Sequence, residues 1–166
     1  MVKLNKNYFV VNPYNKEDIA QIISFEEENN GVFLSKSINE MKASLSEEEY
    51  KRLRKTSNTI ILDFCLKEGN KIKDLCHIIG ERDRKVCTIY PAPIKGKRKK
   101  LIEEATNYTF NTLGMEQVFI TTKSEDLNMI KALEELEYIS LGDESGNIIY
   151  LKDKEELKEK GRRISQ

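Results

Sequence analysis

Short apolar runs bounded by polar turns predict the strands of this chain. Three of these runs follow one another closely and are divided only by turn-like residues at 68–70 and 81–84, which favours an antiparallel meander. Two more flank the turn-like residues 143–146 and predict a C-terminal hairpin. The strand candidates are residues 8–11, 59–66, 73–79, 85–90, 117–122, 138–141 and 147–151.

Apolar residues at helical spacing predict helices between these strands. Asn15 is a suitable N-cap for the first helix, and Ser46 with Glu49 has the spacing of a capping box that opens the second. Ser124 is placed to cap the last core helix. The helix candidates run from Lys16 to residues 29–31, from Ser46 through Lys55, from about residue 99 to Gly114 and from Ser124 through Leu136, with a less regular segment at 37–43.

The order of these elements predicts a single domain over residues 1–152 with a charged C-terminal tail over 153–166. Its class is α/β (α+β): a mixed, mostly antiparallel central sheet of about seven strands flanked by about four helices. The strand, helix and strand between residues 85 and 122 form a right-handed crossover unit, so two of the strands are expected to be parallel.

Charge and composition narrow the function classes. Lys plus Arg and Asp plus Glu number 28 each, so the whole molecule has no net field to attract nucleic acid or anionic lipid, and an anion site must be local. The longest apolar runs are too short to span a bilayer, and the N-terminus lacks the apolar core of a signal peptide. We therefore expect a cytoplasmic protein without a membrane or nucleic-acid partner.

The cysteines and the single histidine do not indicate a metal or redox centre. The three cysteines are an odd number, form no C-x-x-C pair and recur every 11 residues on three successive strands, where packing as small apolar side chains is the simplest interpretation. His77 lies in a strand, and a structural role is favoured over proton transfer. Asp74 and Glu81 flank that strand, where carboxylates are usually solvated, so we assign no catalytic residue and no metal ligand.

The stretch "PAPIKGKRKKLIEEA" (residues 91–105) carries candidate chemistry. It places five cationic side chains and Gly96 between a predicted strand and a predicted helix. Helix N-termini expose unpaired N–H groups and partial positive charge, so cations there are unfavourable unless an anion compensates for them. The alternative is a solvated turn balanced by Glu103 and Glu104. In its strand, loop and helix context, the stretch favours a phosphate site.

The order of elements, and this stretch in particular, resembles the GNAT superfamily of N-acetyltransferases over essentially the whole chain. The family's phosphate-loop pattern, R/Q-x-x-G-x-G/A followed by a helix, falls on Pro93-Ile94-Lys95-Gly96-Lys97-Arg98. Leu113-Gly114-Met115 is similar to the usual end of that helix, and residues 132–138, "ALEELEY", are similar to the family's last helix.

Four positions depart from the family pattern. Pro93 stands in place of the first Arg or Gln, Arg98 in place of the final small residue, and Asp126 in place of the Asn that usually opens the last helix. Leu133 stands where many members have a tyrosine that protonates the leaving thiolate. The acid that protonates the thiolate in many members is therefore absent from its usual place.

The resemblance implies that acetyl-CoA is the cosubstrate, with its pantetheine arm paired to the fourth strand of the family's fold and its diphosphate at the following helix. Its partners would be a CoA thioester and an amine acceptor, and the acetyl group would pass directly to a primary amine of a small molecule or protein. The alternatives are a catalytically inactive acyl-CoA-binding or protein-interaction module and, with less support, nucleic-acid binding; a homodimer stays open. The expected cofactor-binding residues are Thr88, Ile89, Tyr90, Ile94, Lys95, Gly96, Lys97, Arg98, Lys99, Asp126 and Asn128.

Overall fold

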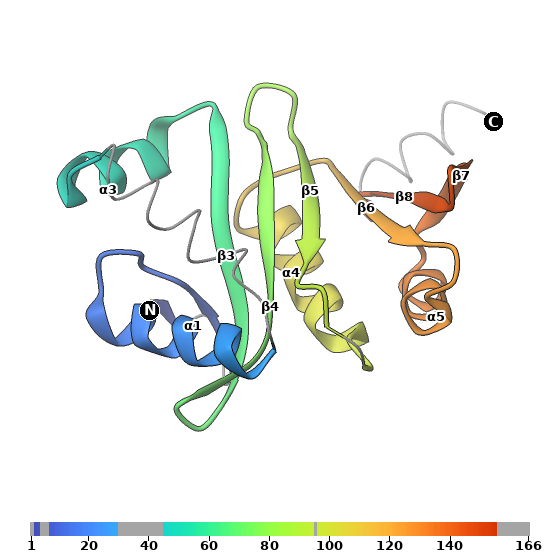
Figure 1. The fold of residues 1–166 in the computed structure, drawn as a ribbon. Coiled ribbons are helices and arrows are strands. Elements are labelled where there is room, and N and C mark those ends of the chain that lie inside the picture. Colours follow the sequence, from blue (N-terminus) through green and yellow to red (C-terminus); the bar gives the residue numbers. More distant parts are fainter. Residues whose placement is uncertain (1, 4–6, 30–44, 95, 156–166) are drawn as a thin grey trace.

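The computed structural model describes residues 2–3, 7–29, 45–94 and 96–155, and its centre is one twisted sheet (Figure 1). The strands lie in the order β1-β2-β3-β4-β5-β6-β8-β7, and every neighbouring pair is antiparallel except β5 and β6. The mostly antiparallel sheet and its one parallel pair are as predicted. The strands are β1 (Val2–Lys3), β2 (Tyr8–Val10), β3 (Thr59–Glu68), β4 (Lys71–Glu81), β5 (Val86–Pro91), β6 (Gln117–Lys123), β7 (Ile139–Glu144) and β8 (Asn147–Asp153).

Four helices of the described chain accompany the sheet, and most of their capping residues were predicted correctly. Asn15 accepts hydrogen bonds from two N–H groups of the first helical turn, and Ser46 with Glu49 forms the expected capping box. The expected cap Ser124 is wrong: its hydroxyl donates to the Gly146 carbonyl, and Asp126 caps the last helix instead. The helices are α1 (Lys16–Glu28), α3 (Glu47–Thr56), α4 (Lys99–Asn111) and α5 (Leu127–Glu135).

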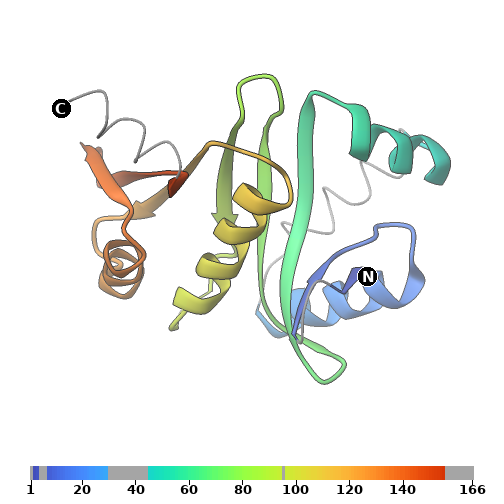
Figure 2. The same cartoon turned by 180° about the vertical axis from the view of Figure 1, so that it is seen from behind.

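The helices cover the sheet from opposite sides (Figures 1 and 2). Apolar residues of α4 and α5 share one core cluster with the strand residues that face them, such as Ile78 and Ile89. Ile22 and Phe25 of α1 pack in a second cluster with Cys65 and Leu75, which point to the other face. Because side chains alternate along a strand, this division fixes which face each residue of β3, β4 and β5 presents.

Strands β5 and β6 separate partway along their length. Only three residue pairs join them, from Val86 with Gln117 to Thr88 with Phe119. Beyond Thr88, β5 stays paired with β4 as far as Pro91, and β6 stays paired with β8 as far as Lys123. We call this divergence of β5 and β6 the fork, and it is visible in Figure 1.

The expected boundaries of the domain remain predictions. Strand β8 continues through Asp153, one residue past the expected end of the domain. The rest of the expected tail from residue 156 onward, and the weaker helix candidate at 37–43, lie outside the described residues.

Candidate functional site

The edge of β5 that faces the fork is set by its pairing with β4. The Ala92 N–H donates to the Leu75 carbonyl at 3.0 Å, so Ala92 directs its backbone groups at β4. Since these groups alternate along an antiparallel strand, Tyr90 and Thr88 also direct theirs at β4, whereas Ile89 and Pro91 direct theirs toward the fork. Of the three residues expected to offer main-chain groups to a cofactor, Ile89 alone is oriented to do so.

Pro91 changes the chemistry of this edge, because proline has no N–H. The last two fork-facing positions of β5 therefore present the carbonyls of Ile89 and Pro91 but only one N–H. An extended ligand lying in the fork would find mainly hydrogen-bond acceptors here. Amide N–H groups of a ligand would suit this edge.

Helix α4 begins beside the fork without a capping side chain. Its N-cap residue is Arg98, no side-chain oxygen caps the first turn, and that turn contains no acidic residue. Among described residues, no acceptor lies opposite the N–H groups of Lys99, Lys100 and Leu101. These groups and the helix dipole suit a bound anion such as a phosphate.

Gly96 lies in the loop that leads into α4 and has a φ of +135°. A Cβ placed on it would meet no atom within 4 Å. Glycine is therefore required here by the backbone conformation, which L residues rarely adopt, and not by a lack of space. The path of the loop into α4 requires this conformation at Gly96.

The lysines near the start of α4 differ in whether they form an ion pair with another side chain. Lys97 and Lys100 are exposed. The Lys99 Nζ atom lies 2.9 Å from a carboxylate oxygen of Glu135 at the end of α5, and this hydrogen bond lowers the pKa of the Glu135 carboxyl. Lys95 lies outside the described residues. Lys97 and Lys100 are thus the described lysines best placed to attract an anion at the helix start.

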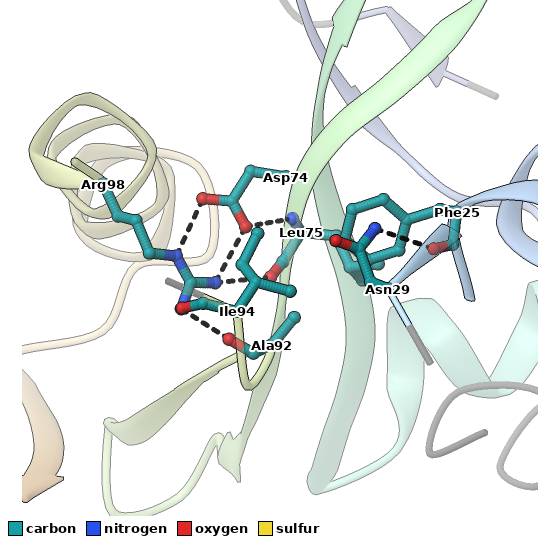
Figure 3. Close-up of polar contacts among 7 residues, drawn as sticks. All are labelled: Phe25, Asn29, Asp74, Leu75, Ala92, Ile94 and Arg98. Carbon is teal, nitrogen blue, oxygen red and sulfur yellow. Dashed lines mark hydrogen bonds and ion pairs between the residues drawn. The ribbon is translucent and has the colours of Figure 1, made fainter. Parts of the chain in front are cut away.

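Arg98 is turned into the protein. Its side chain is buried and donates to Asp74 on β4, with Nε 2.9 Å and Nη2 2.7 Å from the two carboxylate oxygens (Figure 3). Asp74 was expected to be solvated, and that expectation is wrong: it is buried. The side chain of Arg98 was expected to attract a phosphate from solution, whereas here it binds protein groups.

The start of α5 is the other wall that the sequence predicted. Asp126 accepts a hydrogen bond from the Met129 N–H at 3.1 Å, and Asn128 is exposed in the first turn. No hydrogen bond or ion pair between described residues joins either of them to the loop before α4. Leu133, in place of the family's tyrosine, is fully buried in the core beneath α4.

A row of polar side chains crosses the sheet next to the fork, on the face opposite α4. Asp63 on β3 pairs with His77 on β4, and His77 pairs with Tyr90 on β5. The His77 Nδ1 atom lies 2.5 Å from a carboxylate oxygen of Asp63, and both side chains are mostly buried. Tyr90 is 49% exposed. Sequence reasoning did not link Asp63 to His77, although both alternate with core residues on strands predicted to be neighbours.

The cysteines form no common site. Cys65 lies in the α1 core cluster, whereas Cys76 and Cys87 lie in the cluster beneath α4. Burial raises the pKa of the Cys65 thiol to about 12 and that of Cys87 to about 11, so both are poor nucleophiles. Within the described ranges, no group of His, Cys, Asp and Glu is arranged to hold a metal ion.

No helix in the described part of the chain has the length and apolar character needed to cross a membrane.

No family model and no curated protein matches the sequence. Solved structures do match the fold, and N-acetyltransferases are among them.

One similar structure is the Campylobacter jejuni N-acetyltransferase PseH, with 12% identity, a TM-score of 0.60, and coverage of 90% of this chain and 99% of that one. PseH in complex with acetyl coenzyme A matches with 15% identity, a TM-score of 0.57, and coverage of 89% and 99%. Mutant forms of the Vibrio cholerae spermidine/spermine N-acetyltransferase SpeG match with 15% identity, a TM-score of 0.60, and coverage of 92% and 97%. The chain therefore has the fold of the GNAT N-acetyltransferases.

Proposed function

We propose that the protein is an acetyl-CoA-dependent N-acetyltransferase that transfers acetyl directly, in a ternary complex, to a primary amine of a small molecule or protein. One observation carries this proposal: the start of α4, which lies beside the fork, has exposed lysines and N–H groups without a partner or a capping side chain among the described residues. A diphosphate and an extended acyl-pantetheine arm need these two features side by side.

The cofactor would bind mainly through main-chain groups. The diphosphate would accept hydrogen bonds from N–H groups between Gly96 and Leu101, with screened attraction from Lys97 and Lys100. The amide N–H groups of the pantetheine arm would donate to the fork-facing carbonyls of Ile89 and Pro91. The main-chain groups of Thr88 and Tyr90 and the side chain of Arg98 bind protein groups, so they leave the proposed set of cofactor contacts. Ile94, Lys95, Lys99, Asp126 and Asn128 stay part of the proposal.

The similar solved structures support the cosubstrate and the class of acceptor. PseH was solved with acetyl coenzyme A, and the name of SpeG gives spermidine and spermine, which are amines. A cytoplasmic location and assembly into a homodimer are proposed with them.

The reaction would form a bond from the amine nitrogen to the acetyl carbon and break the bond from that carbon to sulfur. The amine must give up a proton and the CoA thiolate must gain one. His77 is placed to help, because it lies one strand away from the unpaired end of β5 and its Nδ1 lies 2.5 Å from a carboxylate oxygen of Asp63. We propose His77 as the proton acceptor, acting directly or through water, and Asp63 as its positioning residue.

Replacing the histidine tests that role. His77→Gln is expected to lower kcat by about 100-fold or more, because general base catalysis contributes roughly that much, while the affinity for acetyl-CoA stays unchanged. Asp63→Asn should give a smaller loss and alter the pH profile of kcat. A His77→Gln enzyme that retains wild-type kcat across the pH range would remove His77 from the mechanism.

The proposed activity is tested by incubating the protein with acetyl-CoA and a panel of primary amines. Release of CoA thiol together with acetylated amine, identified by mass spectrometry, is the expected result. Calorimetric titration with acetyl-CoA and CoA measures binding separately. Failure to bind either compound would overturn the proposal.

The alternative is a non-catalytic acyl-CoA-binding module, and one specific observation favours it. Pro91 has no N–H where the fork edge of β5 would otherwise offer a donor to the thioester carbonyl, and backbone donors of this kind stabilise the developing oxyanion. Tight binding of acetyl-CoA without turnover of any amine, at neutral or alkaline pH, would establish this alternative.

A further inference from the structure

Arg98 stands at the boundary between the loop after β5 and helix α4. It is the N-cap residue of α4, yet its side chain makes no capping bond and is 7% exposed. Figure 3 shows it extending from the start of the helix toward β4 and the end of β5. A buried guanidinium requires an explanation, because charges are rarely buried unless they are paired.

All five N–H donors of this guanidinium have protein acceptors. Nε and one Nη2 hydrogen bind Asp74 as a two-point pair, and Nη2 also lies 3.4 Å from the Leu75 carbonyl. Nη1 donates to the carbonyl of Ala92 and lies 3.4 Å from that of Ile94. An arginine has five donors in a rigid fork, so none is left for a ligand.

The acceptors come from three parts of the chain. Asp74 and Leu75 belong to β4, Ala92 follows the end of β5, and Ile94 lies within the loop. The guanidinium therefore connects both ends of the loop to each other and to the central strand. Asp74 is itself fixed, because its Oδ1 accepts the Leu75 N–H at 2.7 Å.

Stability alone is a weak explanation of this arrangement, because a buried ion pair can often be replaced by apolar residues without loss of stability. What an apolar pair would not provide is directed bonds to the carbonyls of Ala92 and Ile94. These bonds tie Ala92 and Ile94 to the start of α4 without any ligand. A loop fixed in this way binds a ligand without the entropy cost of ordering.

We propose that Arg98, held by Asp74, is a positioning residue that orders the main-chain N–H groups at the start of α4 to receive a diphosphate. This inference rests on the proposed function and deepens it. The guanidinium does not contact the phosphates itself. Arg98 stands where the family pattern has a small residue. Its side chain joins the loop to β4 through hydrogen bonds to Asp74, Ala92 and Ile94.

The test compares two arginine-to-lysine variants. Arg98→Lys keeps the charge but loses the five-donor fork, so the KM for acetyl-CoA should rise about tenfold or more with kcat within about twofold of wild type. Arg82→Lys is the matched control. Arg82 also donates to carbonyls, those of Ser57 and Arg54, but it lies at the opposite end of β4, so its variant should leave both constants unchanged.

A second substrate separates ordering of the loop from general damage to the fold. S-acetylpantetheine lacks the diphosphate, so Arg98→Lys should leave its KM unchanged while raising that of acetyl-CoA. An equal rise for both substrates, or no rise for either, would overturn the proposal. If the activity cannot be measured, the same comparison is made with binding constants from calorimetry.

Asp74→Asn distinguishes positioning from direct contact and also serves if Arg98→Lys fails to fold. Asp74→Asn weakens the hold on the guanidinium, so a positioning role predicts weaker binding of acetyl-CoA by about tenfold. A direct phosphate ligand, released from its carboxylate, would bind acetyl-CoA as tightly as before or more tightly, and that result would overturn the proposal. A wild-type protein that binds no acetyl-CoA would instead reject the proposed function.

Discussion

Helices α3 and α4 begin in opposite ways. At α3, the Ser46 hydroxyl accepts the Glu49 N–H at 3.2 Å, the Glu49 carboxylate accepts the Ser46 N–H at 3.3 Å, and the first turn is acidic. At α4, no side chain in the described part of the molecule caps the first turn, which carries Lys99 and Lys100 instead of acids. The start of α3 is satisfied by its own residues, whereas the start of α4 is not.

This difference shows where a ligand can contribute. Negative charge near a helix N-terminus is favourable and positive charge is unfavourable, by about 0.3–1 kcal/mol per group. Glutamates in the first turn stabilise the start of α3, whereas lysines in the first turn of α4 interact unfavourably with the helix dipole. The start of α4 is therefore less stable than the start of α3. A bound anion would supply the negative charge and the hydrogen-bond acceptors that the start of α4 lacks.

Reversing the charge at α4 should have the largest effect. Lys97→Glu combined with Lys100→Glu is expected to weaken acetyl-CoA binding by about 100-fold, because two attractive charges become repulsive. The same change should leave the protein equally stable or slightly more stable, since acids suit a helix start. Calorimetric titration and urea unfolding measure the two quantities.

The control for this variant reverses the comparison. Glu47→Lys combined with Glu48→Lys at α3 should lower the free energy of unfolding and leave acetyl-CoA binding unchanged. A gain in acetyl-CoA affinity for the α3 variant as large as the loss for the α4 variant would mean that net charge matters and the helix start does not.

Gly96→Ala should have the next largest effect. Forcing an L residue into the backbone conformation of Gly96 costs roughly 1–3 kcal/mol, and relaxation of the loop should weaken acetyl-CoA binding about tenfold. Gly69→Ala is the matched control: Gly69 has a φ of +63° in the turn between β3 and β4, also without close neighbours. Thermal unfolding should detect both variants, but only Gly96→Ala should change binding.

Ser46→Ala should affect stability alone. Loss of the capping hydroxyl is expected to lower the free energy of unfolding by about 1 kcal/mol, measured by urea denaturation. Binding of acetyl-CoA should not change, because α3 lies away from the fork. A change in affinity would contradict the division of roles between the two helix starts.

Glu135→Gln should have the smallest effect and sharpens the account of α4. The hydrogen bond from Lys99 lowers the pKa of Glu135 in the folded state, so its contribution to stability is present above the unfolded pKa and is lost as the pH falls through the folded pKa. The group is exposed, so pH titrations of variant and wild-type stability should nearly coincide at neutral pH and converge further in acid. Release of Lys99 should raise acetyl-CoA affinity by no more than about twofold.

The fold was predictable because its signals are local. Asn15 and the pair Ser46 and Glu49 mark helix starts through hydrogen bonds that span only three residues. The meander of β3, β4 and β5 follows from apolar runs and short turns. Ser124 and Asp126 were harder to separate, because both suit a cap and the choice depends on Gly146, which lies over 20 residues away in sequence.

The candidate site was only partly predictable because its decisive contacts are long-range. In the sequence, Arg98 cannot be distinguished from the other cations of the basic stretch, because its partner Asp74 is 24 residues away. The pairing of His77 with Asp63 depends on the register of β3 and β4, which the apolar pattern does not define to the residue. The orientation of Thr88 and Tyr90 toward β4 depends on the same register.

The proline at the end of β5 also bears on self-association. An unpaired strand edge invites another chain to add to it, and natural sheets protect such edges with residues that cannot extend the ladder. Pro91 blocks the donor on the unpaired edge of β5, and Pro93 follows two residues later. Because the sheet opens in its middle, the missing donor makes this edge of β5 a poorer template for a strand of another molecule, so a homodimer is expected to form through a different surface.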